Sequence, residues 1–102
     1  MASISRADRR AGRAPRVRAL FAERTDAALD VLELVELAWH DCYGEISPSE
    51  EIVDDILFLS EGDLAKLALY ARMAVADWRD LRMNVLAARG ALSGTSRSKS
   101  RS

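Results

Sequence analysis

Residues 25–44 of this 102-residue chain read TDAALDVLELVELAWHDCYG, and this stretch determines the fold class. Its apolar residues recur at intervals of three and four, which places their side chains on one face of an α-helix. Thr25 can cap the first turn, Asp26 complements the helix dipole, and Gly44 can end the helix. The pattern therefore predicts a helix over residues 26–43 with one buried face. That face holds Leu29, Leu32, Val35, Trp39 and Cys42.

Two capping signals follow this helix along the chain. The sequence SPSE at residues 47–50 combines a capping serine, a proline at the first helical position and a capping-box glutamate. This combination predicts a second helix. Ser60, followed by EGD, repeats the pattern and predicts a third helix after almost no linker. The third helix keeps the apolar period until Gly90, so it is about 28 residues and about 42 Å long. A neighbour of about 12 residues cannot cover that length. A second copy of the chain is therefore a candidate to cover Met83, Val85 and Leu86 near its end.

No segment shows sustained alternation of apolar and polar residues, so strands are not expected. We expect an all-α fold, a three- to four-helix bundle with a long C-terminal helix and flexible basic termini. Pro15 can open a short additional helix, and whether residues 15–24 form a separate helix stays open. The bundle domain is expected over residues 15–90. Flexible tails are expected at residues 1–14 and 91–102, which mix small residues and arginine without apolar periodicity.

The formal net charge of −1 conceals a strong segregation of charge along the chain. Residues 1–22 hold six arginines and one aspartate, a charge of +5, and residues 81–102 hold five bases and no acid, also +5. Residues 23–80 hold fifteen acids and four bases, a charge of −11. Fields are screened beyond about 10 Å, so this local pattern matters more than the net value. It indicates a protein partner or self-association, for which the candidate residues are Glu50, Glu51, Asp54, Asp55, Arg79 and Arg82.

The composition limits the class of protein further. Apolar residues make up 49% of the chain, which is enough for the core of one small domain. Cys42 is the only cysteine, so no disulfide can form within the chain. Apolar runs fall far short of the roughly 18 to 20 residues that cross a bilayer, and the arginine-rich start lacks a hydrophobic signal segment. We therefore expect a cytoplasmic protein with no membrane contact. Arginine outnumbers lysine 13 to 2, a bias typical of a high-GC bacterial genome.

His40 is the only histidine, and helical spacing puts Glu36 one turn before it on a shared face. A carboxylate and an imidazole at this spacing are a weak candidate pair of metal ligands, because a catalytic zinc site normally has three protein ligands. We favour a solvated or partner-facing role for both. Cys42 lies about 200° from His40 around the helix, so the two do not form a nucleophile and base pair. No phosphate-binding fingerprint is present. We expect no catalytic residues, no metal and no cofactor, and hence not an enzyme.

The strings WHDCYGEISPSEEIVDDIL, at residues 39–57, and SEGDLAKLALYARMAVADWRDLR, at residues 60–82, resemble those of small uncharacterised helical proteins of actinobacteria. The resemblance covers residues 26–82 and implies no activity. The chain is also similar in size, acidity and helix content to nuclease-colicin immunity proteins. The paired tyrosines of their recognition helix have no counterpart here, and the third helix is longer. This likeness implies nothing beyond charge and size.

Three functions are compatible with these patterns. We favour a non-enzymatic protein–protein interaction module or homodimeric adaptor. An immunity-like or antitoxin-like acidic inhibitor of a basic protein is an alternative, because charge complementarity speeds association. A weak nucleic-acid binder that uses the basic tails is another, because clustered arginine and lysine bind phosphates. Nucleic acid is the less expected partner, since the acidic centre would repel a duplex.

Overall fold

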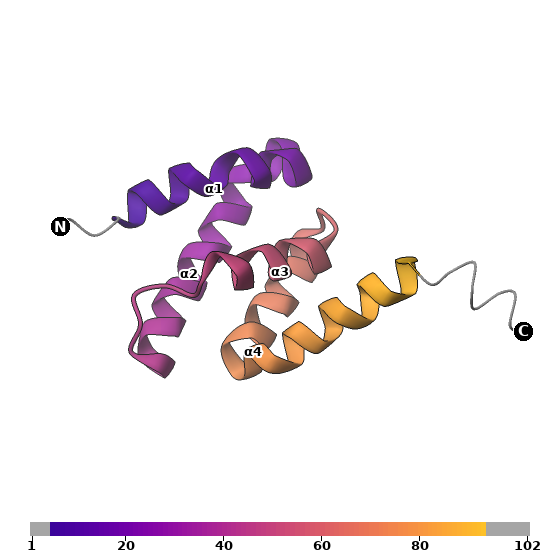
Figure 1. The fold of residues 1–102 in the computed structure, drawn as a ribbon. Helices are drawn as coiled ribbons and strands as arrows, with labels where there is room; N and C mark the ends of the chain where they lie inside the picture. Colours follow the sequence, from indigo (N-terminus) through magenta and orange to yellow (C-terminus); the bar gives the residue numbers. More distant parts are fainter. Residues whose placement is uncertain (1–4, 94–102) are drawn as a thin grey trace, which may run out of the picture.

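The computed structural model of the chain describes residues 5–93. All regular secondary structure in this range is helical, which confirms the predicted all-α class. Within it, four α-helices and one 3-10 turn follow one another (Figure 1). They are α1 Arg6–Phe21, η1 Ala22–Arg24, α2 Thr25–Tyr43, α3 Glu50–Ser60 and α4 Leu64–Ser93. No helix among the described residues is both long and apolar enough to cross a membrane.

The helices share one hydrophobic core. In it α1 packs on α2, α2 packs on α4, and α3 packs chiefly on α4. Its most deeply buried side chains come from all four helices and include Val17, Leu32, Val53, Ile56, Leu67 and Leu81. The buried face predicted for residues 26–43 is confirmed at Leu29, Leu32, Val35 and Trp39. Cys42 is exposed instead.

The N-terminal segment differs from the expectation of a flexible tail over residues 1–14. The structure begins α1 at Arg6, and the side chain of Ser5 accepts a hydrogen bond of 3.1 Å from the backbone N–H of Asp8. Pro15 lies inside α1 rather than at its start. Residues 6–14 show no apolar periodicity. Ion pairs, described below, hold this segment in place, and an apolar pattern does not reveal such contacts. Residues 1–4 lie outside the described residues.

At the other end, α4 continues past the expected boundary at residue 90 and ends at Ser93. The rest of the C-terminal tail expected over residues 91–102 lies outside the described residues. The helical part of the structure therefore extends beyond the expected 15–90 domain at both ends.

The ends of α2 agree closely with the predicted bounds. Gly44 adopts a left-handed conformation with φ 72°, and its N–H donates to the carbonyl of His40 at 2.9 Å. The prediction that Gly44 ends this helix is confirmed. Thr25 is the first residue of α2 rather than its cap, and its hydroxyl donates to the carbonyl of Ala22 in the 3-10 turn.

The two capping signals each act a few residues later than predicted. Ser49, not Ser47, caps α3, and its hydroxyl oxygen accepts from the N–H of Ile52 at 3.3 Å. Asp63, not Ser60, caps α4, and its carboxylate accepts from two backbone N–H groups of the first turn at 2.8 and 3.2 Å. Serine and aspartate have the same capping chemistry, so the sequence alone does not choose between neighbours.

The turn between α3 and α4 is sharp and seated against α1. Glu61 and Gly62 both take left-handed backbone conformations, with φ 53° and 77°. A Cβ atom at Gly62 would lie 2.6 Å from the carbonyl oxygen of Leu20, at the end of α1. Glycine is therefore required at residue 62 for its conformation and for the close approach of α1.

The third predicted helix is broken, contrary to the expectation of an uninterrupted helix of about 28 residues. Asp77 has φ −161° and ψ 94°, which separates α4 into a proximal half, residues 64–76, and a distal half, residues 78–93. The two halves lie at an angle to each other (Figure 1). The break turns the distal half back onto α3, where Leu81 and Val85 are buried. Val85 therefore needs no second copy to cover it.

We expect opposite effects from alanine at two glycines. Gly62→Ala should lower the free energy of unfolding by about 1–3 kcal/mol, because a side chain is strained in this conformation and collides with the Leu20 carbonyl. Gly12→Ala should raise it by about 0.5–1 kcal/mol, because Gly12 lies inside α1 with open space around it. Urea unfolding followed by circular dichroism measures both. A Gly62→Ala variant as stable as the native chain would contradict the close approach.

Candidate functional site

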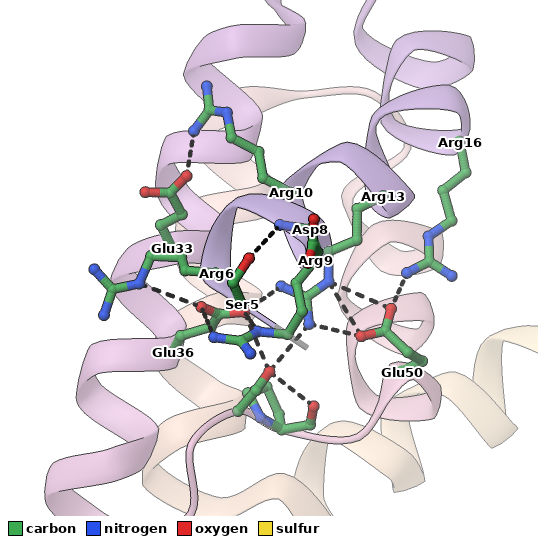
Figure 2. Close-up of polar contacts among 12 residues, drawn as sticks. Ser5, Arg6, Asp8, Arg9, Arg10, Arg13, Arg16, Glu33, Glu36 and Glu50 are labelled. Carbon is green, nitrogen blue, oxygen red and sulfur yellow. Dashed lines mark hydrogen bonds and ion pairs between the residues drawn. The ribbon is translucent and has the colours of Figure 1, made fainter. Parts of the chain in front are cut away.

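Arginines of α1 converge on one buried carboxylate of α2. Arg9 Nε lies 2.6 Å from Glu36 Oε2, and Arg9 Nη2 lies 3.1 Å from Glu36 Oε1. Arg13 Nη1 lies 2.7 Å from Glu36 Oε2. Figure 2 shows these arginines around the Glu36 carboxylate. The Glu36 side chain is 1% exposed, and that of Arg13 is 3% exposed. A carboxylate taken out of water needs such partners, because an unpaired buried charge is very costly.

The same row of arginines also binds α3 and the outer side of α2. Arg13 Nη2 lies 2.7 Å from Glu50 Oε2 and 3.0 Å from the hydroxyl of Ser47. Arg16 pairs with Glu50 (Figure 2). It also pairs with Asp54 at 2.8 Å. On the other side, Arg10 pairs with Glu33 at 2.6 Å and with Asp30 at 2.8 Å. We call these contacts the arginine network, which consists of Arg9, Arg10, Arg13 and Arg16 with Asp30, Glu33, Glu36, Glu50 and Asp54.

The arginine network lowers the pKa of two carboxyl groups. Burial raises the pKa of Glu36, but hydrogen bonds from Arg9 and Arg13 outweigh it and hold the pKa below its ordinary value of 4.5. The pKa of Glu50 is lowered in the same way. Burial raises this pKa, but hydrogen bonds from Arg13 and Arg16 lower it by more. Both groups are therefore charged wherever the protein is folded near neutral pH.

The weak metal candidates Glu36 and His40 lie in different surroundings. They line one shallow pocket of about 430 Å³, but both oxygens of Glu36 already accept hydrogen bonds from arginine, whereas the His40 side chain is 65% exposed. A cation would have to displace the arginines to reach Glu36. Nowhere in residues 5–93 do three or more His, Cys, Asp or Glu side chains gather in a way that could hold a metal ion.

The candidate partner-binding residues of α3 are engaged within the chain. Glu50 and Asp54 belong to the arginine network. On the other side of α3, Arg82 of the distal half of α4 lies 2.8 Å from Asp55 and 3.2 Å from Glu51. The Asp55 side chain is only 5% exposed. Arg79 makes no such pair with α3, and its guanidinium lies 5.3 Å from the centre of the Trp78 ring.

An apolar groove between α2 and the proximal half of α4 is the feature that the sequence patterns did not reveal. It has a volume of about 730 Å³. We call it the α2–α4 groove. Its lining comes from α2 through Val31, Leu34, Val35, Ala38, Cys42 and Tyr43, and from α4 through Ala68, Ala71, Arg72, Val75 and Ala76. One feature of the sequence could have indicated this groove: the apolar face of α2 is broader than one neighbouring helix covers.

The groove is open along its length, and few of its lining groups are polar. Leu34 is 64% exposed, and Cys42, Ala68 and Ala76 are also exposed. The Tyr43 hydroxyl donates to the carbonyl of Val75 at 2.8 Å, which joins the two walls at one end. Arg72 is the single charged residue among the lining residues. Its guanidinium makes no hydrogen bond or ion pair with other residues of the described range.

No protein-family model, curated protein or solved structure matches the chain. The arginine network and the α2–α4 groove are therefore interpreted from their own chemistry.

Neutralising the central carboxylate of the arginine network should destabilise the fold. We expect Glu36→Gln to lower the free energy of unfolding by about 3 kcal/mol, because Arg9 and the buried Arg13 lose their shared counterion. Glu33→Gln is the matched control, and it should cost less than about 1 kcal/mol, because Glu33 and Arg10 are about one-third exposed. Urea unfolding of both variants measures the difference. Equal costs would show that burial of Glu36 is not what makes its ion pairs important.

The stability of the native chain should fall in acid. Glu36 and Glu50 have lowered pKa values, so below pH 4.5 the unfolded chain binds protons that the folded chain does not. Their contribution is fully present above this pH and is lost as the pH falls through the folded-state pKa values. Urea midpoints measured from pH 7 down to pH 3 should fall mainly below about pH 5. Glu50→Gln should show a shallower fall, and an identical pH profile would contradict the assignment.

Proposed function

We propose that this helical bundle is a non-enzymatic protein-interaction module, and that its α2–α4 groove binds an amphipathic helix of a partner protein. The observation that carries the proposal is an open groove of about 730 Å³ with one charged lining residue. Apolar helix faces commonly bind such grooves through side chains spaced at three and four residues.

The exposure of the groove favours a helix over a small molecule. Pockets for small ligands bury most of the ligand surface. Here Leu34, Cys42 and Ala68 are exposed, so a small ligand would remain largely in water. A helix about two turns or longer can instead cover the length of both walls and bury Leu34.

The positive charge of Arg72 favours a partner helix with a negative charge at the matching position. The Arg72 guanidinium lies in a wall that is otherwise mostly apolar, and no acidic side chain among residues 5–93 is paired with it. A carboxylate at the edge of the partner's apolar face would form a charge-assisted hydrogen bond with it. The partner helix is therefore expected to carry Asp or Glu beside its apolar stripe.

The two alternative functions receive less support. An acidic inhibitor needs free carboxylates, but Glu50, Glu51, Asp54 and Asp55 are paired with arginines of the same chain. Binding of nucleic acid through the N-terminal segment needs free arginines. Four arginines of α1 are held by carboxylates in the arginine network.

Selection of helical peptides from a phage-displayed library against the folded protein tests the groove. We expect selected peptides with apolar residues at i, i+3 or i+4, and i+7 and with an acidic residue beside them. Leu34→Asp should weaken their binding at least about tenfold, because Leu34 is central to the apolar wall. Leu37→Asp is the matched control on the same helix, since Leu37 is 46% exposed and does not line the groove. Fluorescence anisotropy measures the affinities.

Cys42 provides a second readout. It is the only thiol and lines the groove, so a bound helix should slow its alkylation by N-ethylmaleimide. A photo-crosslinker attached to Cys42 should then join a helix of the same pattern in a lysate of the source organism, and Leu34→Asp should abolish that product. Peptides that bind Leu34→Asp as tightly as the native chain, or that leave Cys42 fully reactive, would refute the proposed site.

A further inference from the structure

We propose that α4 can straighten at Asp77, and that two copies of the chain then exchange the distal halves of α4 to form a domain-swapped dimer. The exchange concerns residues 78–93 and leaves the α2–α4 groove in place, since that groove is lined only by α2 and the proximal half. The two proposals therefore have separate tests, although Ala76 lines the groove and also belongs to the exposed stripe of α4 described below.

The break in α4 occurs without proline or glycine, at an aspartate that can cap a helix. Sharp helix breaks usually occur at proline, at glycine or at inserted side chains. Residues 71–83 read ARMAVADWRDLRM and contain neither proline nor glycine, and alanine, arginine and methionine favour helix. Only one residue, Asp77, leaves the helical conformation, and its carboxylate caps the distal half through a 3.0 Å hydrogen bond from the N–H of Arg79. A continuous helix is thus a low-cost alternative for this stretch.

Contacts with α3 hold the distal half in its bent position. Leu81 is fully buried and Val85 is 2% exposed in the shared core. Arg82 binds the buried Asp55, and the Arg89 guanidinium lies 4.4 Å from the centre of the Phe58 ring. These contacts join the distal half to α3, and the α3 of another copy offers the same partners.

A straight α4 is not expected in an isolated chain. It would expose Leu81 and Val85, and it would leave Asp55 buried without the arginine that neutralises it. Two straight chains restore every one of these contacts by exchanging distal halves. Exchange of identical elements through a very short hinge is a low-cost route to a symmetric dimer, and the hinge here is a single residue.

Exposed apolar residues on α4 give a second reason to expect another copy. Leu69 and Met83 are 53% and 64% exposed, and Ala76 between them is exposed as well. They are spaced seven residues apart, so on a straight helix they lie along one side and form one apolar stripe. The break at Asp77 interrupts this stripe in the bent form. Two straight α4 helices that cross near residue 77 could bury it against each other.

The decisive experiment identifies which chain supplies the distal half. The Arg82→Lys variant keeps the charge and introduces an amine beside Glu51 and Asp55, to which a carbodiimide can couple it. Equal amounts of ¹⁴N- and ¹⁵N-labelled variant are unfolded together, refolded at high concentration and separated by size. The dimer fraction is then crosslinked and its peptides are analysed by mass spectrometry. About half of the crosslinks from residue 82 to α3 should join chains of different label, the statistical share for exchanged halves.

Lys66 supplies an internal control in the same sample. Its amine lies 2.7 Å from Glu61, and both residues precede the hinge, so their crosslink should join residues of one label in monomer and dimer alike. This crosslink also shows that the variant is folded. A dimer fraction in which every crosslink from residue 82 joins residues of one label, or the absence of a dimer at any concentration after refolding, would overturn the proposal.

Variants at the hinge test the straightening itself. Trp78→Pro suits the first position of the distal half and forbids a continuous helix, so it should abolish the dimer. Trp78→Ala removes the same indole but permits a straight helix, and it should still form the dimer. Asp77→Ala removes the cap from both hinges and should lower the dimer Kd by about ten- to thirtyfold. Sedimentation velocity measures all three, and equal dimerisation of the two Trp78 variants would refute a straight α4.

Discussion

The carboxylate of Glu36 is the constraint on which the rest of the structure depends. It lies in the interior, where an unpaired charge would be prohibitive, and it receives guanidinium groups from Arg9 and Arg13. Those two arginines fix the position of α1 along α2. Arg13 then reaches Glu50 and ties the same helix to the start of α3. A single buried charge thus determines how three helices meet, while the apolar core supplies most of the driving force.

The sequence predicted the elements that apolar periodicity and local capping control. The bounds of α2, the left-handed Gly44 and the existence of helices after the two serine signals follow from contacts within a few residues. The place of α1 could not be predicted in this way. Within the arginine network its partners are carboxylates 20 to 38 residues away, and ion pairs leave no periodic trace in a sequence.

The break at Asp77 and the groove were missed for a related reason. No proline or glycine lies near the break, and an aspartate inside a helical pattern does not by itself predict one. The bend also depends on burial of Leu81 and Val85 on α3. Periodicity shows which face of α2 is apolar, but it does not show how much of that face a neighbour covers. Leu34 is apolar and in phase with the core, yet it remains exposed. The charge segregation was visible in the sequence, and the structure pairs several arginines of α1 with carboxylates of α2 and α3.

The long separation between the arginines of α1 and their carboxylates has a consequence for the order in which the chain acquires structure during synthesis. Isolated, α1 carries like charges at three- and four-residue spacing, which repel each other and weaken a helix. Its counterion Glu50 is synthesised 37 residues after Arg13, a delay of about 2 to 7 s at typical rates of translation. α1 therefore lacks part of its counterions until the start of α3 has been synthesised. Until then the nascent chain presents a cationic segment that only its own later residues neutralise.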